Sequence, residues 1–126
     1  MTGFFLVFLG GGFGAALRHG VNILSARWLG TAFPYATIIE NVSGSLVMGL
    51  LAGYFAFKGG EASQAWRLFL ATGILGGYTT FSAFSLDTML LYERGETALA
   101  ALYVLASVAL AIGGLFAGLA LVRHFS

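Results

Sequence analysis

Four long stretches of this 126-residue sequence contain almost no charged side chains. Only 9% of its residues are Asp, Glu, Lys or Arg, whereas soluble domains carry about 25%, and the mean hydropathy is +0.91. A membrane-spanning helix needs about 20 mainly apolar residues, so the length accommodates four spans joined by short loops. We therefore predict an all-α membrane protein with four transmembrane helices, and a single four-helix transmembrane domain over residues 1–126.

The composition excludes several kinds of site and partner. The sequence has no cysteine, which rules out disulfides and thiolate-bound metals. His19 and His124 each stand beside an arginine at a predicted helix end, which argues against a histidine metal cluster. A formal net charge of +1 argues against a nucleic-acid partner.

The predicted spans place the N-terminus, the 58–67 loop and the C-terminus on the same side of the membrane. The spans cover residues 3–24, 35–57, 66–92 and 97–122. Basic residues are divided almost evenly between the two sides, with Lys58, Arg67 and Arg123 on one and Arg27 and Arg94 on the other. The positive-inside rule then sets no firm orientation. A chain without such a bias can insert both ways and pair antiparallel with itself.

The third predicted span contains a segment that does not suit a continuous helix. Gly76 and Gly77 lower helix propensity, and the β-branched Thr79 and Thr80 lose rotamer freedom in a helix. Non-helical backbone at membrane depth must be buried in protein or line a wet cavity. We therefore predict a break at Gly76–Thr80 that presents backbone carbonyls and amides to a polar site. A packed kink without function is the simpler alternative, but the four hydroxyls and two phenylalanines around it favour a functional site.

Polar and small residues gather on one face of the second span and one face of the fourth. On the second span this face holds Thr37, Asn41, Gly44, Ser45 and Met48, at steps of three and four residues. On the fourth it holds Tyr103, Ser107, Ala111, Gly114 and Gly118. The glycines are typical of a helix–helix interface, as are Gly10 and Gly14 on the first span. The Asn41 amide needs either an interhelical hydrogen bond or a water-filled path, because it lies too deep to reach bulk water.

Arg18 and Glu40 are the charged residues that fit a membrane span least well. Arg18 lies near the end of its span, where it either reaches the interface or serves a polar vestibule. A carboxylate at Glu40 is costly unless it is paired, protonated or wet. It is rotated by about 100° around the helix from Asn41, so it faces a different environment. Arg18 is a candidate partner.

The neutral donors and aromatic rings suit a small ion better than a large phosphorylated substrate. Phe81 and Phe84 lie on one face of the helix that resumes after the break. The edge of a phenyl ring is positive and favours a small anion. Hydroxyl and amide donors replace part of the hydration of such an ion. The carbonyls of a broken helix suit a small cation.

Residues 76–85, Gly-Gly-Tyr-Thr-Thr-Phe-Ser-Ala-Phe-Ser, resemble the signature G-G-x-[ST]-T-F-S-[TA]-F of the Fluc (CrcB) family of fluoride channels. Residues 41–45 resemble its N-x-x-G-[ST] element, and Leu17-Arg18 resembles its first-helix arginine. The length, the four spans and the weak charge bias also match, so the resemblance covers the whole chain.

The resemblance implies a passive fluoride channel, not an enzyme, that exports cytoplasmic fluoride across the bacterial inner membrane and relieves its toxicity. It implies an antiparallel, dual-topology homodimer with two pores. A structural sodium ion would be held on the dimer axis by the backbone carbonyls of Gly76 and Thr79 from both chains. The implied fluoride-pore residues are Asn41, Phe81, Phe84, Thr37, Ser82, Tyr103 and Ser107.

Two positions depart from the family pattern, and two other function classes stay open. Ala111 stands where some members carry a hydroxyl, and Glu40 stands where an apolar residue is expected. A proton-coupled exporter similar to the small multidrug-resistance family would need a membrane carboxylate, for which Glu40 is the candidate. A non-transporting membrane assembly subunit would have no need of the Phe-Ser-x-Phe-Ser face.

Overall fold

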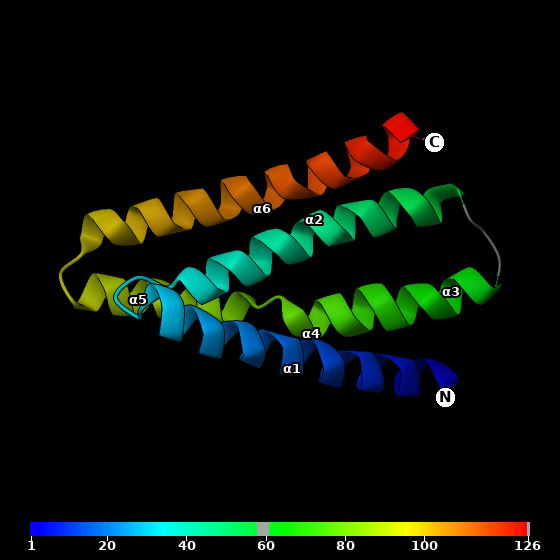
Figure 1. Cartoon of the computed structure of the whole chain (residues 1–126), viewed down its shortest axis with the longest axis horizontal. Coiled ribbons are helices and arrows are strands. Elements are labelled where there is room, and N and C mark those ends of the chain that lie inside the picture. The colour runs from blue at the N-terminus through cyan, green and yellow to red at the C-terminus, as the bar shows by residue number, and fades with distance from the viewer. Residues whose placement is uncertain (58–60, 126) are drawn as a thin grey trace.

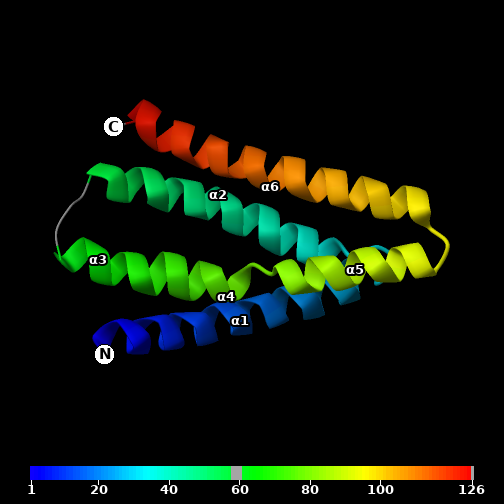
Figure 2. The same ribbon diagram turned by 180° about the vertical axis from the view of Figure 1, so that it is seen from behind.

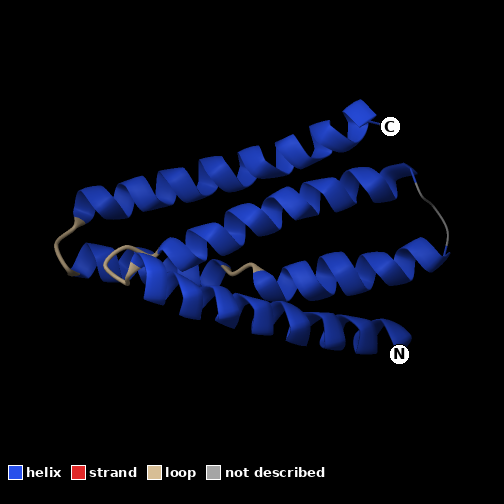
Figure 3. Ribbon diagram, viewed as in Figure 1, coloured by secondary structure: helices blue, strands red, loops and turns tan. Residues whose placement is uncertain are grey.

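The computed structural model describes residues 1–57 and 61–125, and these are helical almost throughout (Figure 1, Figure 3). The elements are α1 (Thr2–Leu29), α2 (Tyr35–Phe57), α3 (Glu61–Arg67), the π-helix η1 (Leu68–Leu75), α4 (Gly76–Tyr78), α5 (Phe81–Glu93) and α6 (Thr97–Phe125). Four helical stretches are long and apolar enough to cross a membrane: Thr2–Leu29, Tyr35–Ala56, Ser63–Glu93 and Thr97–Phe125. The predicted all-α fold with four transmembrane helices and a broken third helix is confirmed.

The predicted loop at 58–67 is wrong from residue 61 onward, because the helix already begins at Glu61. Lys58 lies outside the described residues. Arg67 is held at the end of α3, where its Nη2 donates to the Phe55 carbonyl at 3.3 Å and its guanidinium lies 5.4 Å from the centre of the Phe55 ring. These contacts hold the start of the third span against the end of α2. The arginine that makes them is predicted in a loop from the sequence, but it lies in a helix.

The helices form two pairs (Figure 1, Figure 2). α2 lies beside α6, and α1 lies beside η1 and α4. The N-terminus, the C-terminus, the end of α2 and the start of α3 all lie at one end of the bundle, as the predicted spans require. α5 packs against α6, so the third span begins in one helix pair and ends against the other.

Glycines bring the backbones of each pair close together. We call Gly10, Gly14, Gly73 and Gly77 the glycine seam. A Cβ added to Gly10 would stand 2.9 Å from the Cα of Gly73, and one added to Gly14 would stand 2.8 Å from the amide nitrogen of Tyr78. In the other pair, a Cβ on Gly118 would lie 3.0 Å from the carbonyl carbon of Gly49. The predicted small-residue interfaces on α1 and α6 therefore exist within one chain.

The break in the third span is narrower than predicted. Gly76, Gly77 and Tyr78 are still helical, and only two residues are extended: Thr79 with φ −83° and ψ 158°, and Thr80 with φ −153° and ψ 120°. Extended backbone suits β-branched threonine. Gly77 belongs to the glycine seam with α1, so close packing accounts for it better than a change of backbone conformation.

Candidate functional site

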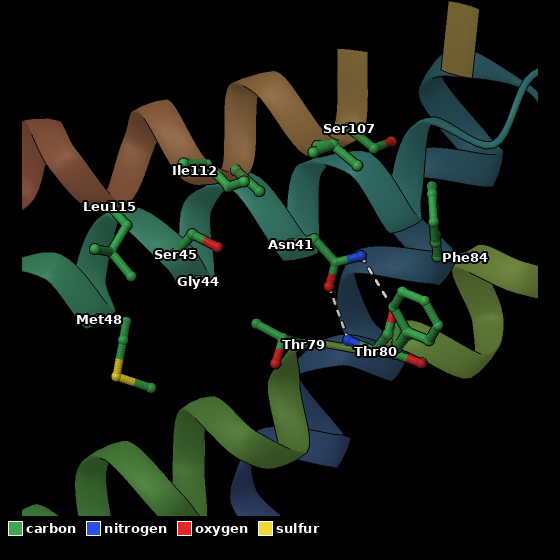
Figure 4. Close-up of a pocket in the computed structure, with 13 residues that line it drawn as sticks. Asn41, Gly44, Ser45, Met48, Thr79, Thr80, Phe84, Ser107, Ile112 and Leu115 are labelled. Atoms are coloured by element: carbon green, nitrogen blue, oxygen red, sulfur yellow. Dashed lines mark hydrogen bonds between the residues drawn. The ribbon is translucent and has the colours of Figure 1, made fainter. Parts of the chain in front are cut away.

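Asn41 on α2 holds the extended residue Thr80 in place (Figure 4). The Thr80 amide donates to Asn41 Oδ1 at 2.8 Å, and Asn41 Nδ2 donates to the Thr80 carbonyl at 3.0 Å. The side-chain amide thus pairs with both backbone groups of one residue, as a neighbouring strand would. Of the two alternatives for this deep asparagine, the structure shows a partner inside the protein, and that partner is the break itself.

At the break, Thr79 keeps its helical hydrogen bond, whereas Thr80 replaces those that a continuous helix would make. The Thr79 amide and hydroxyl each donate to the Leu75 carbonyl at 2.9 Å. Thr80 Oγ1 accepts from the Ala83 amide at 3.1 Å and caps the start of α5. In a continuous helix the amides of Thr80 and Ala83 would bond the carbonyls of Gly76 and Thr79. Because both amides are engaged elsewhere, those two carbonyls lose their helical donors.

A cavity of about 370 Å³ lies between α2, α6 and the break (Figure 4). It is lined by Asn41, Gly44, Ser45, Met48, Thr79, Thr80, Phe81, Phe84, Ser107, Val108, Ala111, Ile112 and Leu115. The predicted face of the second span therefore lines this cavity except at Thr37, and that of the fourth span lines it only through Ser107 and Ala111. Ala111, Ile112 and Leu115 make the α6 wall beyond Ser107 apolar, so the polar part of this wall ends at Ser107.

The two phenylalanines of the break line this cavity but differ in their packing. The Phe84 ring is half-buried, with its centre 5.3 Å from that of Tyr103 and 5.6 Å from that of Phe81. Phe81 is 79% exposed. One ring is therefore fixed by the fold of this chain, while the other faces outward.

Asp87 gathers two residues that the sequence predicted beside Asn41. Thr37 Oγ1 donates to Asp87 Oδ2 at 2.6 Å, and the fully buried Tyr103 donates its hydroxyl to the same oxygen at 3.0 Å. Neither residue lines the Asn41 cavity. From the sequence, Asp87 is expected near the membrane exit, and no role is predicted for it. The available signal was its position three residues after Phe84, on the same face of the helix.

Ser82 lies at the exposed start of α5, apart from both groups of residues. Its hydroxyl is 3.3 Å from that of Thr80. The structure therefore links this predicted pore residue to the break through Thr80 and does not place it in the cavity wall.

A second pocket, of about 310 Å³, lies between α1, α2 and α5 and contains charged residues. Arg18, Glu40 and Asp87 all line it. Arg18 Nε donates to the Gly77 carbonyl at 3.1 Å, next to the break. Glu40 is only 1% exposed, and no described residue gives its Oε2 a hydrogen bond. Glu40 and Asn41 thus face different pockets, as their rotation around the helix predicts.

Arg18 and Glu40 line the same pocket but form no ion pair within the described parts of the chain. The described residues also hold no group of three or more His, Cys, Asp or Glu side chains that would bind a metal.

Comparisons with known proteins agree with the signature of the third span. Residues 5–119 match the family described as CrcB-like protein, Camphor Resistance (CrcB). The chain is 76% identical over 120 residues to a fluoride-specific ion channel FluC of Rhodopseudomonas palustris (strain BisB5), covering 95% of this chain and 96% of that protein. It is 68% identical over 123 residues to a fluoride-specific ion channel FluC 2 of Nitrobacter hamburgensis, covering 98% of each. The family suggested by residues 76–85 is confirmed, and the chain belongs to the CrcB family of membrane proteins.

Proposed function

We propose that this chain forms a passive, fluoride-selective channel in the bacterial inner membrane, which exports cytoplasmic fluoride and relieves its toxicity. The observation that carries the proposal is the cavity in which the Asn41–Thr80 pair, Phe81 and Phe84 meet. The similar proteins from Rhodopseudomonas and Nitrobacter, both named fluoride-specific ion channels, support the choice of ion.

The chemistry of the cavity wall suits a small, strongly hydrated anion. The edges of Phe81 and Phe84 provide positive potential without a mobile charge. Ser107 is 5% exposed, and its Oγ has no hydrogen-bond partner among the described residues. Its hydroxyl is therefore available to donate to an ion in the cavity. Hydrogen bonds of this kind replace water that fluoride loses on entry.

The outward face of Phe81 supports the antiparallel dimer. A ring that is 79% exposed leaves one side of the cavity open in a single chain. A second copy related by a two-fold axis would cover that side and form an equivalent pathway of its own. We infer two pores per dimer, in which Asn41, Phe81, Phe84 and Ser107 contact the ion. Thr37 and Tyr103 would act through Asp87, and Ser82 through Thr80.

The carbonyls of Gly76 and Thr79 fit the structural sodium ion. Their helical donors are engaged by Asn41 and by the cap of α5, which frees these oxygens for another partner. Gly76 is also exposed in the single chain, so its backbone is open to a second copy. Oxygen ligands without a nearby carboxylate group suit a monovalent cation. The ion would fix the two breaks against each other and would not be transported.

Liposomes loaded with potassium fluoride test this function. Valinomycin releases the balancing potassium, and an external electrode measures fluoride. We expect rapid efflux that needs no proton gradient, with little efflux from matched chloride-loaded vesicles or from vesicles without protein. Failure to release fluoride would contradict the channel. Efflux that requires a proton gradient and is lost in Glu40→Gln would favour the exporter instead.

A further inference from the structure

The pocket beside Arg18 has a charge pattern that the proposed fluoride channel does not explain. An anion pathway is expected to contain donors and positive potential, yet Glu40 and Asp87 both line this pocket with a single arginine. The pocket also reaches Gly30 and Thr31 in the connection between α1 and α2. It therefore lies between one end of the bundle and the level of Asn41.

The groups that face Glu40 come from each neighbouring element. α1 provides Arg18 together with neutral Asn22 and Ser25, and α5 provides Asp87. α6 contributes Tyr103, whose hydroxyl is bound to Asp87. Among these charged groups, Asp87 accepts two hydroxyls, and Arg18 uses one of its five N–H donors on Gly77.

The Glu40 carboxyl differs from these groups because it is buried and unsatisfied. It is 1% exposed, and no described residue bonds its Oε2. With both acids ionised, the pocket would carry one net negative charge and repel an anion. With a proton on Glu40, the pocket is neutral, and the carboxyl becomes a hydrogen-bond donor in the same pocket as the guanidinium of Arg18.

We propose that this pocket is the approach by which fluoride reaches the Asn41 cavity, and that Glu40 gates it by admitting the ion only when its carboxyl carries a proton. The proton comes from water and stays on Glu40. Fluoride accepts hydrogen bonds from the carboxyl and from Arg18 and then moves on, so no covalent bond forms and flux stays passive. The inference rests on the proposed function, and it predicts that acid opens the channel.

Fluoride efflux measured at equal pH on both sides of the liposome tests this role between about pH 5 and pH 9, a range wide enough for buried carboxyl groups. Wild-type efflux should fall as pH rises, by at most about tenfold per pH unit because one proton is involved. Glu40→Gln should stay open across the range, because it is neutral and keeps an N–H donor. Glu40→Asp should restore a pH dependence. Protein-free vesicles correct for leakage of hydrogen fluoride.

Glu96→Gln is the matched control. Glu96 is an exposed acid in the α5–α6 connection, its carboxylate lies 2.8 Å from Arg94, and it does not line the pocket, so its variant should keep the wild-type profile. Infrared spectroscopy gives a second readout, since a neutral carboxyl has its own carbonyl band. That band should titrate with the same midpoint as efflux and disappear in Glu40→Gln.

The outcomes separate this inference from the channel function. A flat wild-type profile, or a pH dependence that survives in Glu40→Gln, would overturn the role of Glu40 while leaving the channel intact. If the pH dependence is lost in Asp87→Asn but kept in Glu40→Gln, the proton that controls efflux belongs to Asp87 and the role of Glu40 is overturned. An absence of wild-type efflux at every pH would contradict the channel function itself, and this inference with it.

Discussion

The two halves of the broken third span are held by different kinds of contact. Upstream of the break, η1 and α4 lie against α1 through the glycine seam, where backbone meets backbone. Downstream, α5 lies against α6 through side chains, with Phe84 stacked near Tyr103 and Asp87 bonded to its hydroxyl. The close backbone packing therefore fixes the position of the upstream half against α1, and the downstream half provides the polar and aromatic side chains of the site.

The different neighbours of the two halves also explain what the break allows. In a continuous helix both halves would share one axis, and the side chains of one half would be fixed in their rotation relative to those of the other. Two extended residues allow each half to take the orientation that its own neighbour requires. Asn41 then joins the halves from α2, because it bonds both backbone groups of Thr80.

Asn41→Ala should give the largest effect, since it removes what joins the two halves. The amide and carbonyl of Thr80 would each lose a partner, at about 1–3 kcal/mol per unsatisfied group. We expect fluoride efflux to be abolished and the free energy of unfolding to fall by several kcal/mol. Efflux and reversible unfolding in detergent measure these changes. Asn41→Asp keeps the acceptor for the Thr80 amide but loses the donor to the Thr80 carbonyl, and it should unfold at an intermediate denaturant concentration. Equal stability of the wild type and Asn41→Ala would show that α2 does not hold the break.

Gly14→Ala should have the next largest effect and should act on the upstream half alone. Its Cβ would stand 2.8 Å from the backbone nitrogen of Tyr78, so α1 must move away. Overpacking of this kind costs about 1–3 kcal/mol. Gly12→Ala is the control, because a Cβ there meets nothing within 4 Å among residues 1–57 and 61–125. If Gly14→Ala and Gly12→Ala have the same free energy of unfolding, then close backbone packing against α1 does not hold the upstream half in place.

The aromatic pair should show the smallest effect on stability and a clear effect on transport. Phe81→Ile changes an exposed ring and should leave the stability of the single chain nearly unchanged, whereas Phe84→Ile loses about 1 kcal/mol of ring packing with Tyr103. Each should slow fluoride efflux by about tenfold if a ring edge contributes about 1.4 kcal/mol to ion passage. Wild-type efflux in both single variants, with the dimer intact, would remove the rings from the mechanism.

The sequence was most informative where a local property decides the structure. Long apolar runs located the four helices, and β-branched residues next to glycines located the break. The steps of three and four residues brought Asn41, Gly44, Ser45 and Met48 into one cavity wall, as expected. Such features depend on helix period and propensity, which are properties of the segment itself.

The sequence could not predict contacts that depend on how two helices are shifted along their axes and rotated relative to each other. Thr37 shares a helix face with Asn41, yet it lies one turn away and bonds Asp87. Arg18 was paired in expectation with Glu40, but it donates to the Gly77 carbonyl. A backbone carbonyl freed near a break attracts a guanidinium, and no residue type in the sequence marks such an acceptor.

The π-helical form of η1 determines how this part of the gene tolerates the loss of one codon. Each residue of an α-helix turns the chain by about 100°. A π-helix accommodates more residues per turn, so deleting one codon between Arg67 and Gly73 would let the segment close as a tighter helix. The tighter winding would absorb the missing residue, so the glycine seam and the Arg67 bond to the Phe55 carbonyl, now 3.3 Å, would stay close to their present register. Loss of one residue here should therefore be tolerated better than loss of one residue from an α-helical part of the same span.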